Sequence, residues 1–151
     1  MTLSAVPSLA LTFHQPNALL RADAKRPDGL TLVPWSRGKM LTWDATVTDT
    51  LAPSNLPVSM YTSGAAAEAA SAVKTLKYEQ ISATYLFVSL AVETLGPICV
   101  KGSSFLEELG RRISVKSGDP PQTSFPFQRI SVAIQRFNSS CIRATFDIAP
   151  D

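Results

Sequence analysis

The stretch that most limits what this chain can fold into is the apolar run at residues 84–94, TYLFVSLAVET. It is nearly continuous, and it is rich in β-branched and aromatic residues. Such a run is typical of a strand that is covered on both faces. The pair Gly96 and Pro97 ends it. The run therefore predicts the most central strand of a sheet that has helices on both sides.

A second strand-forming region lies at residues 25–49, KRPDGLTLVPWSRGKMLTWDATVTD. Two apolar runs, 30–33 and 40–47, are separated by the turn sequence 36–39. Gly38 in this turn permits the positive backbone angle that a tight turn needs. Pro34 breaks the first run near its end, because proline cannot donate to a strand ladder. The pattern predicts a β-hairpin.

Two carboxylates lie on this hairpin. Asp28 stands just before the first strand, and Asp44 lies inside the second, between Trp43 and Ala45. A carboxylate within an apolar strand is costly unless it is paired or bound to a metal. One interpretation is that Asp28 caps a turn and Asp44 points to solvent. The other is that the hairpin brings the two carboxylates within about 5–6 Å, where they share one metal ion.

The alanine-rich segment 64–80 predicts a helix, capped by Ser63 or Gly64. Its expected apolar stripe consists of Ala69, Val73, Leu76 and Gln80. Another face carries Lys74, Lys77 and Tyr78, which are spaced at i, i+3 and i+4. That face is interpreted either as a solvated surface with two lysines or as part of a site.

Two more helices are expected after the central strand. The sequence Ser104 to Glu107 matches a capping box, and apolar residues at spacing four follow it to Ile113. The last helix is expected over 124–138. The apolar stripe of this last helix comprises Phe127, Ile130, Ile134 and Phe137. The basic residues of these helices are Arg111, Arg112, Arg129 and Arg136. They form either a solvated surface or a face that contacts phosphates.

The order of elements is hairpin, helix, strand, helix, helix. It predicts a small α/β sandwich with a mixed sheet, flanked by helices. We divide the chain into a truncated lead-in at 1–24, one domain at 25–138 and a tail at 139–151.

Composition narrows the functional classes. The chain has 151 residues, 45% hydrophobic and 17% charged, with a net charge of +2. This permits a polyanionic partner without requiring one.

With one histidine, His14, and no CxxC spacing, a zinc site is not expected. Cys99 and Cys141 are expected to be buried free thiols of an intracellular protein. No apolar run reaches about 18 residues, so no membrane span is expected. The N-terminus also lacks the charged region of a signal peptide.

Several longer stretches resemble one known family. These are KRPDGLTLVPW, LTWDATVTDTLAPS, GAAAEAASAVKTLKY, FVSLAVETLGP, FLEELGRRIS and QRISVAIQRFN. They are similar to the C-terminal part of reverse-transcriptase polyproteins from non-LTR retrotransposons, in the class with a restriction-like endonuclease of PD-(D/E)xK type. The similarity covers about residues 5–138. It implies a restriction-endonuclease-like sandwich and a DNA-nicking endonuclease, which would be nuclear if functional.

The resemblance also implies a site. Asp28 and Asp44 match the metal ligands of the family, with Mg²⁺ or Mn²⁺ as the cofactor and DNA as the partner. The family's lysine is often displaced from the strand to the following helix, ahead of a Lys-Tyr pair. Here Thr46 occupies the strand position, and the helical version is matched by Lys74, Lys77 and Tyr78. The candidate DNA-contacting residues are Arg26, Arg111, Arg112, Arg129 and Arg136.

Two departures from the family leave alternatives open. Gln15 stands before Pro16 where the family tends to have glutamate. The polymerase and the Cys/His knuckle that normally precede this domain are absent from the sequence. One alternative is therefore a decayed, catalytically inactive retroelement fragment that at most binds DNA weakly. Another is a protein-interaction module that uses the apolar central region.

Overall fold

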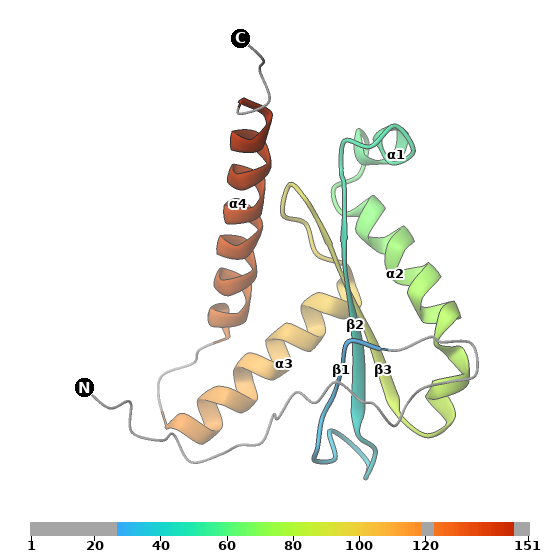
Figure 1. Cartoon of the computed structure of the whole chain (residues 1–151). Helices are drawn as coiled ribbons and strands as arrows, with labels where there is room; N and C mark the ends of the chain where they lie inside the picture. The colour runs from blue at the N-terminus through green and yellow to red at the C-terminus, as the bar shows by residue number, and fades with distance from the viewer. Residues whose placement is uncertain (1–26, 119–122, 147–151) are drawn as a thin grey trace.

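The computed structural model describes residues 27–118 and 123–146. Over these ranges the chain is a small α/β fold with a three-stranded sheet, in agreement with the predicted fold class (Figure 1). The strands are β1 (Gly29–Leu30), β2 (Leu41–Thr48) and β3 (Leu86–Glu93). β1 pairs antiparallel with β2, and β2 pairs parallel with β3, so the sheet is mixed. The lead-in 1–24, Arg26 and residues 147–151 lie outside the described residues.

The predicted hairpin is present, but its first strand is shorter than expected. β1 has two residues. At Thr31 the amide still donates to the Leu41 carbonyl at 2.8 Å, but the Leu41 amide donates to the Thr31 side chain, at Oγ1, at 3.0 Å. The chain then reverses at Arg37 and Gly38, whose φ angles are 49° and 74°. Glycine adopts such angles without strain. The hairpin therefore closes through a loop that is longer than the sequence pattern predicts.

The identity of the central strand was predicted wrongly. The spatial order is β1-β2-β3, so β2 lies in the middle of the described sheet and β3 at its edge. Both faces of β3 are nevertheless covered, which explains its continuous apolar sequence. A parallel pair needs a long crossover connection, and residues 49–85 supply it here.

The helices form layers on the two faces of the sheet. The crossover contains α1 (Leu56–Ser59), α2 (Ala65–Lys77) and the 3₁₀ helix η2 (Glu79–Ala83). After β3 come α3 (Val100–Ser117) and α4 (Ser124–Phe146). Figure 1 shows α2 on one side of the sheet and α3 and α4 on the other. We call these the α2 face and the α4 face.

Helix α2 is present as predicted, but its buried side is not the predicted one. Val73 and Leu76, from the expected apolar stripe, are 65% and 72% exposed. Ala69 and Gln80 are also exposed. The residues that face the sheet are small or polar: Ala66, Ala67, Ser71 and, just after the helix, Tyr78. The reason is tertiary packing, since Ala67 and Ala91 meet fully buried and let α2 lie close to β3.

The last two helices differ from prediction at their ends. Helix α3 begins at Val100, capped by Cys99, whose Sγ accepts from the amide of Gly102 at 3.4 Å. The capping-box sequence at 104–107 therefore lies inside the helix. Helix α4 begins at Ser124 as predicted, but it continues to Phe146, past the expected end at residue 138.

Candidate functional site

The α2 face of the sheet carries a buried carboxylate at its centre. Asp44 lies in the middle of β2 and is 4% exposed. Side chains alternate between the faces of a strand, so Asp44 shares the α2 face with Thr42 and Thr46. In β3 the residue opposite Asp44 is Ser89, which is fully buried. A carboxylate in this position needs partners from the layer above it.

Helix α2 supplies those partners. Lys74 and Tyr78 are four residues apart, so their side chains leave the same side of the helix. The Lys74 ammonium lies 2.6 Å from Asp44 Oδ2. The Tyr78 hydroxyl donates to Asp44 Oδ1 at 2.9 Å. The ring of Tyr78 is buried and packs on Phe87 of β3, with 4.8 Å between the centroids. Both oxygens of Asp44 are therefore held by α2.

Asp28 lies at the start of the neighbouring strand. The pairing of β1 with β2 ends at Gly29 opposite Trp43, and Asp28 is the residue just before this pair. The Asp28 amide donates to the Trp43 carbonyl at 3.0 Å, and its Oδ2 accepts from the Ala45 amide at 2.6 Å. The Asp28 backbone and carboxylate thus bond to the residues on either side of Asp44.

The close approach of β1 to β2 depends on a glycine. A Cβ atom at Gly29 would lie 1.9 Å from the ring of Trp43, so no larger residue fits there. In addition, the Thr42 hydroxyl donates to the Gly29 carbonyl at 2.9 Å. These contacts fix the segment that carries Asp28, which is itself exposed.

The structure separates the two candidate lysines. Lys74 reaches Asp44, whereas Lys77 is exposed and its ammonium lies 5.0 Å from the centroid of the Tyr78 ring. Of the residues predicted for the site, Asp44, Lys74 and Tyr78 are thus in direct contact, and Asp28 bonds to the backbone beside them. Lys77 borders the site through Tyr78.

Sequence reasoning missed three buried polar residues on the α2 face. The hydroxyls of Thr46 and Ser89 are buried and make no hydrogen bond in the described structure. Glu93 is 1% exposed, and its Oε1 accepts from the amides of Ala66 and Ala67 at 3.1 and 3.2 Å. It therefore caps the first turn of α2, where a carboxylate is favoured by the helix dipole. The signal in the sequence was a glutamate at the end of an apolar strand.

The donor set fits a hard divalent cation. Asp28 Oδ1 makes no hydrogen bond with the described residues. Asp44 Oδ2 forms an ion pair with Lys74 but makes no hydrogen bond there. Residues 27–118 and 123–146 contain no group of three or more His, Cys, Asp or Glu side chains that could hold a metal ion. Mg²⁺ is commonly bound by one or two carboxylates together with waters and phosphates. The pair suits Mg²⁺ or Mn²⁺ and does not suit zinc.

Both cysteines are free, as the sequence predicts. Cys99 is buried, and its sulfur also accepts from the amide of Ala91 at 3.4 Å. Cys141 was expected to be buried but is exposed, because α4 extends away from the sheet at that point. The Cys99 thiol donates to the Ser89 carbonyl at 3.4 Å, and neither thiol bonds to Asp44 within the described residues.

The candidate DNA-contacting arginines fall into two groups. Arg111 and Arg112 both pair with Glu108, at 2.7 and 2.6 Å. Their hydrogen bonds, that of Arg111 first, lower the pKa of Glu108 to about 2, and Glu108 in turn raises the pKa of Arg111. Arg112 also stacks on Trp35, with its guanidinium carbon 3.8 Å from the ring centroid, and donates to the Trp35 carbonyl. Arg112 therefore ties α3 to the hairpin loop, whereas Arg111 pairs with Glu108 of the same helix.

Arg129 and Arg136, the second group, line an open depression of about 600 Å³ along α4. Arg26, the remaining candidate, lies outside the described residues.

No family model, curated protein or solved structure matches this chain. Within the described residues, none of the helices has the length and apolar content that crossing a membrane requires.

Proposed function

We propose that this chain is a metal-dependent DNA endonuclease domain derived from a retrotransposon, with a restriction-endonuclease-like sandwich fold. It would nick a target site by phosphodiester hydrolysis at Asp28 and Asp44, acting on DNA in the nucleus. The observation that carries the proposal is the contact between buried Asp44 and Lys74. A lysine delivered from the crossover helix takes the place of the lysine that is absent at Thr46.

The two aspartates have the roles of metal ligands in this proposal. Asp44 is fixed by α2, and Asp28 is fixed by its bonds to the β2 backbone on either side of Asp44. Carboxylates held in this way keep their geometry without help from substrate. A bound Mg²⁺ or Mn²⁺ would stabilise the charge that develops on the phosphate and make a water molecule more acidic.

In this proposal Lys74 and Tyr78 both act on Asp44, and Lys74 also reaches the attacking water. The Lys74 ammonium neutralises a carboxylate that burial would otherwise penalise. Its side chain is 26% exposed, so it can also contact a water at the edge of the site. Tyr78 orients Asp44 through Oδ1. Lys74 is therefore the preferred catalytic lysine, and Lys77 borders the site.

One observation favours the alternative of an inactive fragment. Both oxygens of Asp44 are already bound within the protein, and no third acidic side chain joins the pair among the described residues. A fold that had lost its activity would retain such internal bonds. The alternative predicts a folded protein that binds DNA weakly and does not cut it.

Nicking of supercoiled plasmid DNA distinguishes an active endonuclease from an inactive fragment. We expect wild-type protein to nick DNA in Mg²⁺ or Mn²⁺ and not in EDTA, with little sequence preference. Asp44→Asn should abolish nicking while the protein stays folded, since it removes a ligand charge at nearly equal volume. Asp28→Asn should have the same effect.

Asp49→Asn is the matched control, because Asp49 is exposed at the end of β2 and bonds only to neighbouring loop atoms. This variant should nick DNA like the wild type. Folded wild-type protein that does not nick DNA in any metal would establish the inactive alternative. Nicking that persists in Asp28→Asn and Asp44→Asn would place the chemistry elsewhere.

A further inference from the structure

Helix α4 carries a row of arginines that the endonuclease site does not use. Arg129, Arg136 and Arg143 are seven residues apart, a spacing that keeps side chains on nearly one face of a helix. Each step of seven residues advances about 10.5 Å along the axis. All three are exposed. We call this row the arginine face of α4.

The charge of this helix is entirely positive. Its sequence, SFPFQRISVAIQRFNSSCIRATF, contains no aspartate and no glutamate. None of its three arginines pairs with a carboxylate of the described residues, whereas Arg111 and Arg112 on α3 both pair with Glu108. Unpaired cations spaced regularly along a rigid element attract a polyanion.

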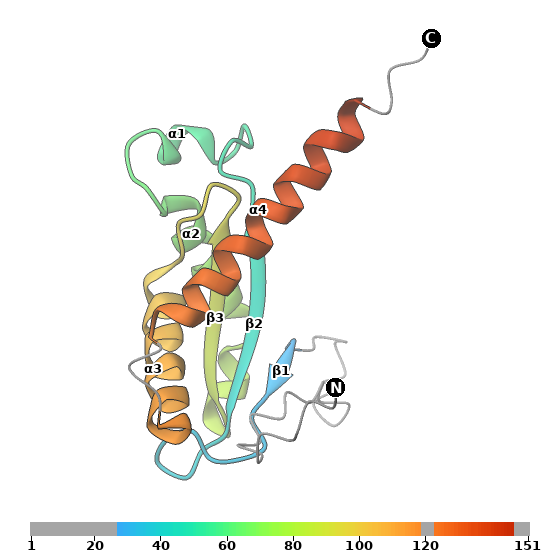
Figure 2. The same ribbon diagram turned by 90° about the vertical axis from the view of Figure 1, so that its left-hand side faces the viewer.

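The arginine face is open to a large partner. The last hydrogen bond between α4 and the rest of the domain joins the Asn138 side chain to the Thr94 carbonyl, at 2.8 Å. From Ser139 to Phe146 every residue is exposed. Figure 2 shows this half of the helix extending past the sheet, on the side where β1 forms its edge. A partner could therefore lie along the helix without meeting the body of the domain.

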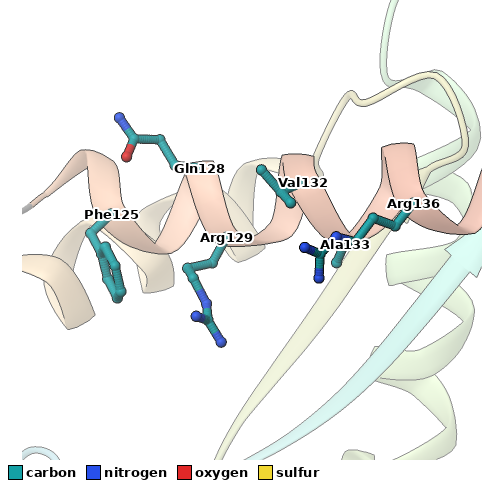
Figure 3. A pocket seen from close by; sticks show the side chains of 6 residues that line it. All are labelled: Phe125, Gln128, Arg129, Val132, Ala133 and Arg136. Atoms are coloured by element: carbon teal, nitrogen blue, oxygen red, sulfur yellow. The ribbon is translucent and has the colours of Figure 1, made fainter.

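The arginine side chains of α4 are placed so that they can form one contact surface. Figure 3 shows Phe125 and Arg129 projecting to the same side of α4, with Arg136 further along the helix. The Arg129 guanidinium carbon lies 5.9 Å from the centroid of the Phe125 ring, which supports its position. Arg136 also borders a second open depression that ends at Arg143. The three cations thus line one continuous surface.

We propose that the arginine face of α4 binds the phosphate backbone of duplex DNA, as a contact separate from the Asp28–Asp44 site. The choice of DNA rests on the proposed function, and the charge and spacing of the arginines rest on the structure. Arginine pairs well with phosphate because its planar donors match two oxygens at once. Phosphate contacts carry no sequence information, so this surface holds the duplex without selecting a sequence.

Fluorescence anisotropy with a labelled 30-base-pair duplex in EDTA tests this without any need for cleavage. The variant R129Q/R136Q/R143Q should bind at least about tenfold more weakly than wild type at low salt. The salt slope, log K against log[salt], should become shallower by about 2.7, since each lost phosphate contact removes about 0.9. The triple lysine variant should retain most of the binding.

The matched control is R37Q/K101Q/K116Q, which removes three exposed charges from the hairpin turn and α3 and lowers the net charge equally. It should bind nearly as well as wild type. Equal weakening in both variants would reduce the effect to net charge and overturn the proposal. Unchanged binding in the α4 variant would do the same, as would tighter binding to single-stranded RNA than to the duplex. Because metal is absent, a failure of nicking would leave this result unaffected.

Discussion

The two faces of the sheet differ in an unusual way: the enclosed α2 face carries polar residues, and the more exposed α4 face carries apolar ones. On the α2 face, Asp44, Ser89 and Glu93 are 4%, 0% and 1% exposed. On the α4 face, Val47 of β2 and Phe137 of α4 are both 61% exposed. The closed face is thus polar, and the apolar face is partly open, around a cavity of about 330 Å³ between the sheet and α4.

This difference suggests separate roles for the two faces, with the α4 face contributing to stability and the α2 face to the proposed site. Burial of apolar surface drives folding, and the α4 face together with the small-residue contact of α2 provides it. Buried charges and unpaired hydroxyls oppose folding, and an apolar replacement of a buried ion pair is often neutral or stabilising. Glu93 has a structural role as the cap of α2, whereas the burial of Asp44 and Ser89 is what the proposed site would require.

The largest effect is expected from breaking the buried ion pair. Lys74→Met leaves the Asp44 carboxylate buried without its counter-charge, and should lower the free energy of unfolding by about 3 kcal/mol. Urea denaturation measures this. The double variant Lys74→Met with Asp44→Asn removes the orphaned charge, and should be more stable than the sum of the single effects by about 2 kcal/mol. Strictly additive effects would mean that the pair is not coupled in solution.

A smaller effect is expected from the apolar face. Ile134 on α4 is 8% exposed and lines the cavity against the sheet. Ile134→Ala should lower the free energy of unfolding by about 2 kcal/mol, near the low end for such a truncation, because the cavity already opens to solvent. Nicking by the remaining folded protein should be unchanged. A loss of nicking without a loss of stability would contradict the division of roles between the faces.

The smallest effect is expected from an ion pair that is not buried. Glu108 bonds to Arg111 and Arg112, and its pKa is lowered from 4.5 to about 2. A lowered pKa stabilises the folded state above pH 4.5, and this contribution is lost as the pH falls towards 2. Because the cluster is solvated, the loss should be at most about 1 kcal/mol. The melting temperatures of wild type and Glu108→Gln should converge as the pH falls over this range. A constant difference would show that the pairing does not depend on ionisation.

Local patterns in the sequence predicted most of the elements. The glycine at position 38 indicated the hairpin turn, the alanines indicated α2, and the run at 84–94 indicated β3. The position of β3 at the edge was not predictable, because strand order depends on the pairing of a two-residue β1 with β2. The cap on α3 was missed because cysteine is not a usual capping residue.

The candidate site was partly predictable. Asp44 attracted attention as a charge within an apolar strand, and the shared face of Lys74 and Tyr78 followed from helical spacing. The buried side of α2 was predicted wrongly because Val73 and Leu76 are more hydrophobic than the residues that face the sheet. Packing against β3 favours small side chains there, and no helical periodicity of hydrophobic residues reports that preference.

The proposed site requires Asp28 and Asp44 to hold one divalent cation, and electron paramagnetic resonance of Mn²⁺ measures this binding. We expect one bound Mn²⁺ per wild-type chain, competed by Mg²⁺, with affinity reduced more than about tenfold in either Asp28→Asn or Asp44→Asn. Asp49→Asn should bind like the wild type. Folded wild-type protein that binds no Mn²⁺, or variants that all bind it equally, would rule out a metal site shared by the two aspartates.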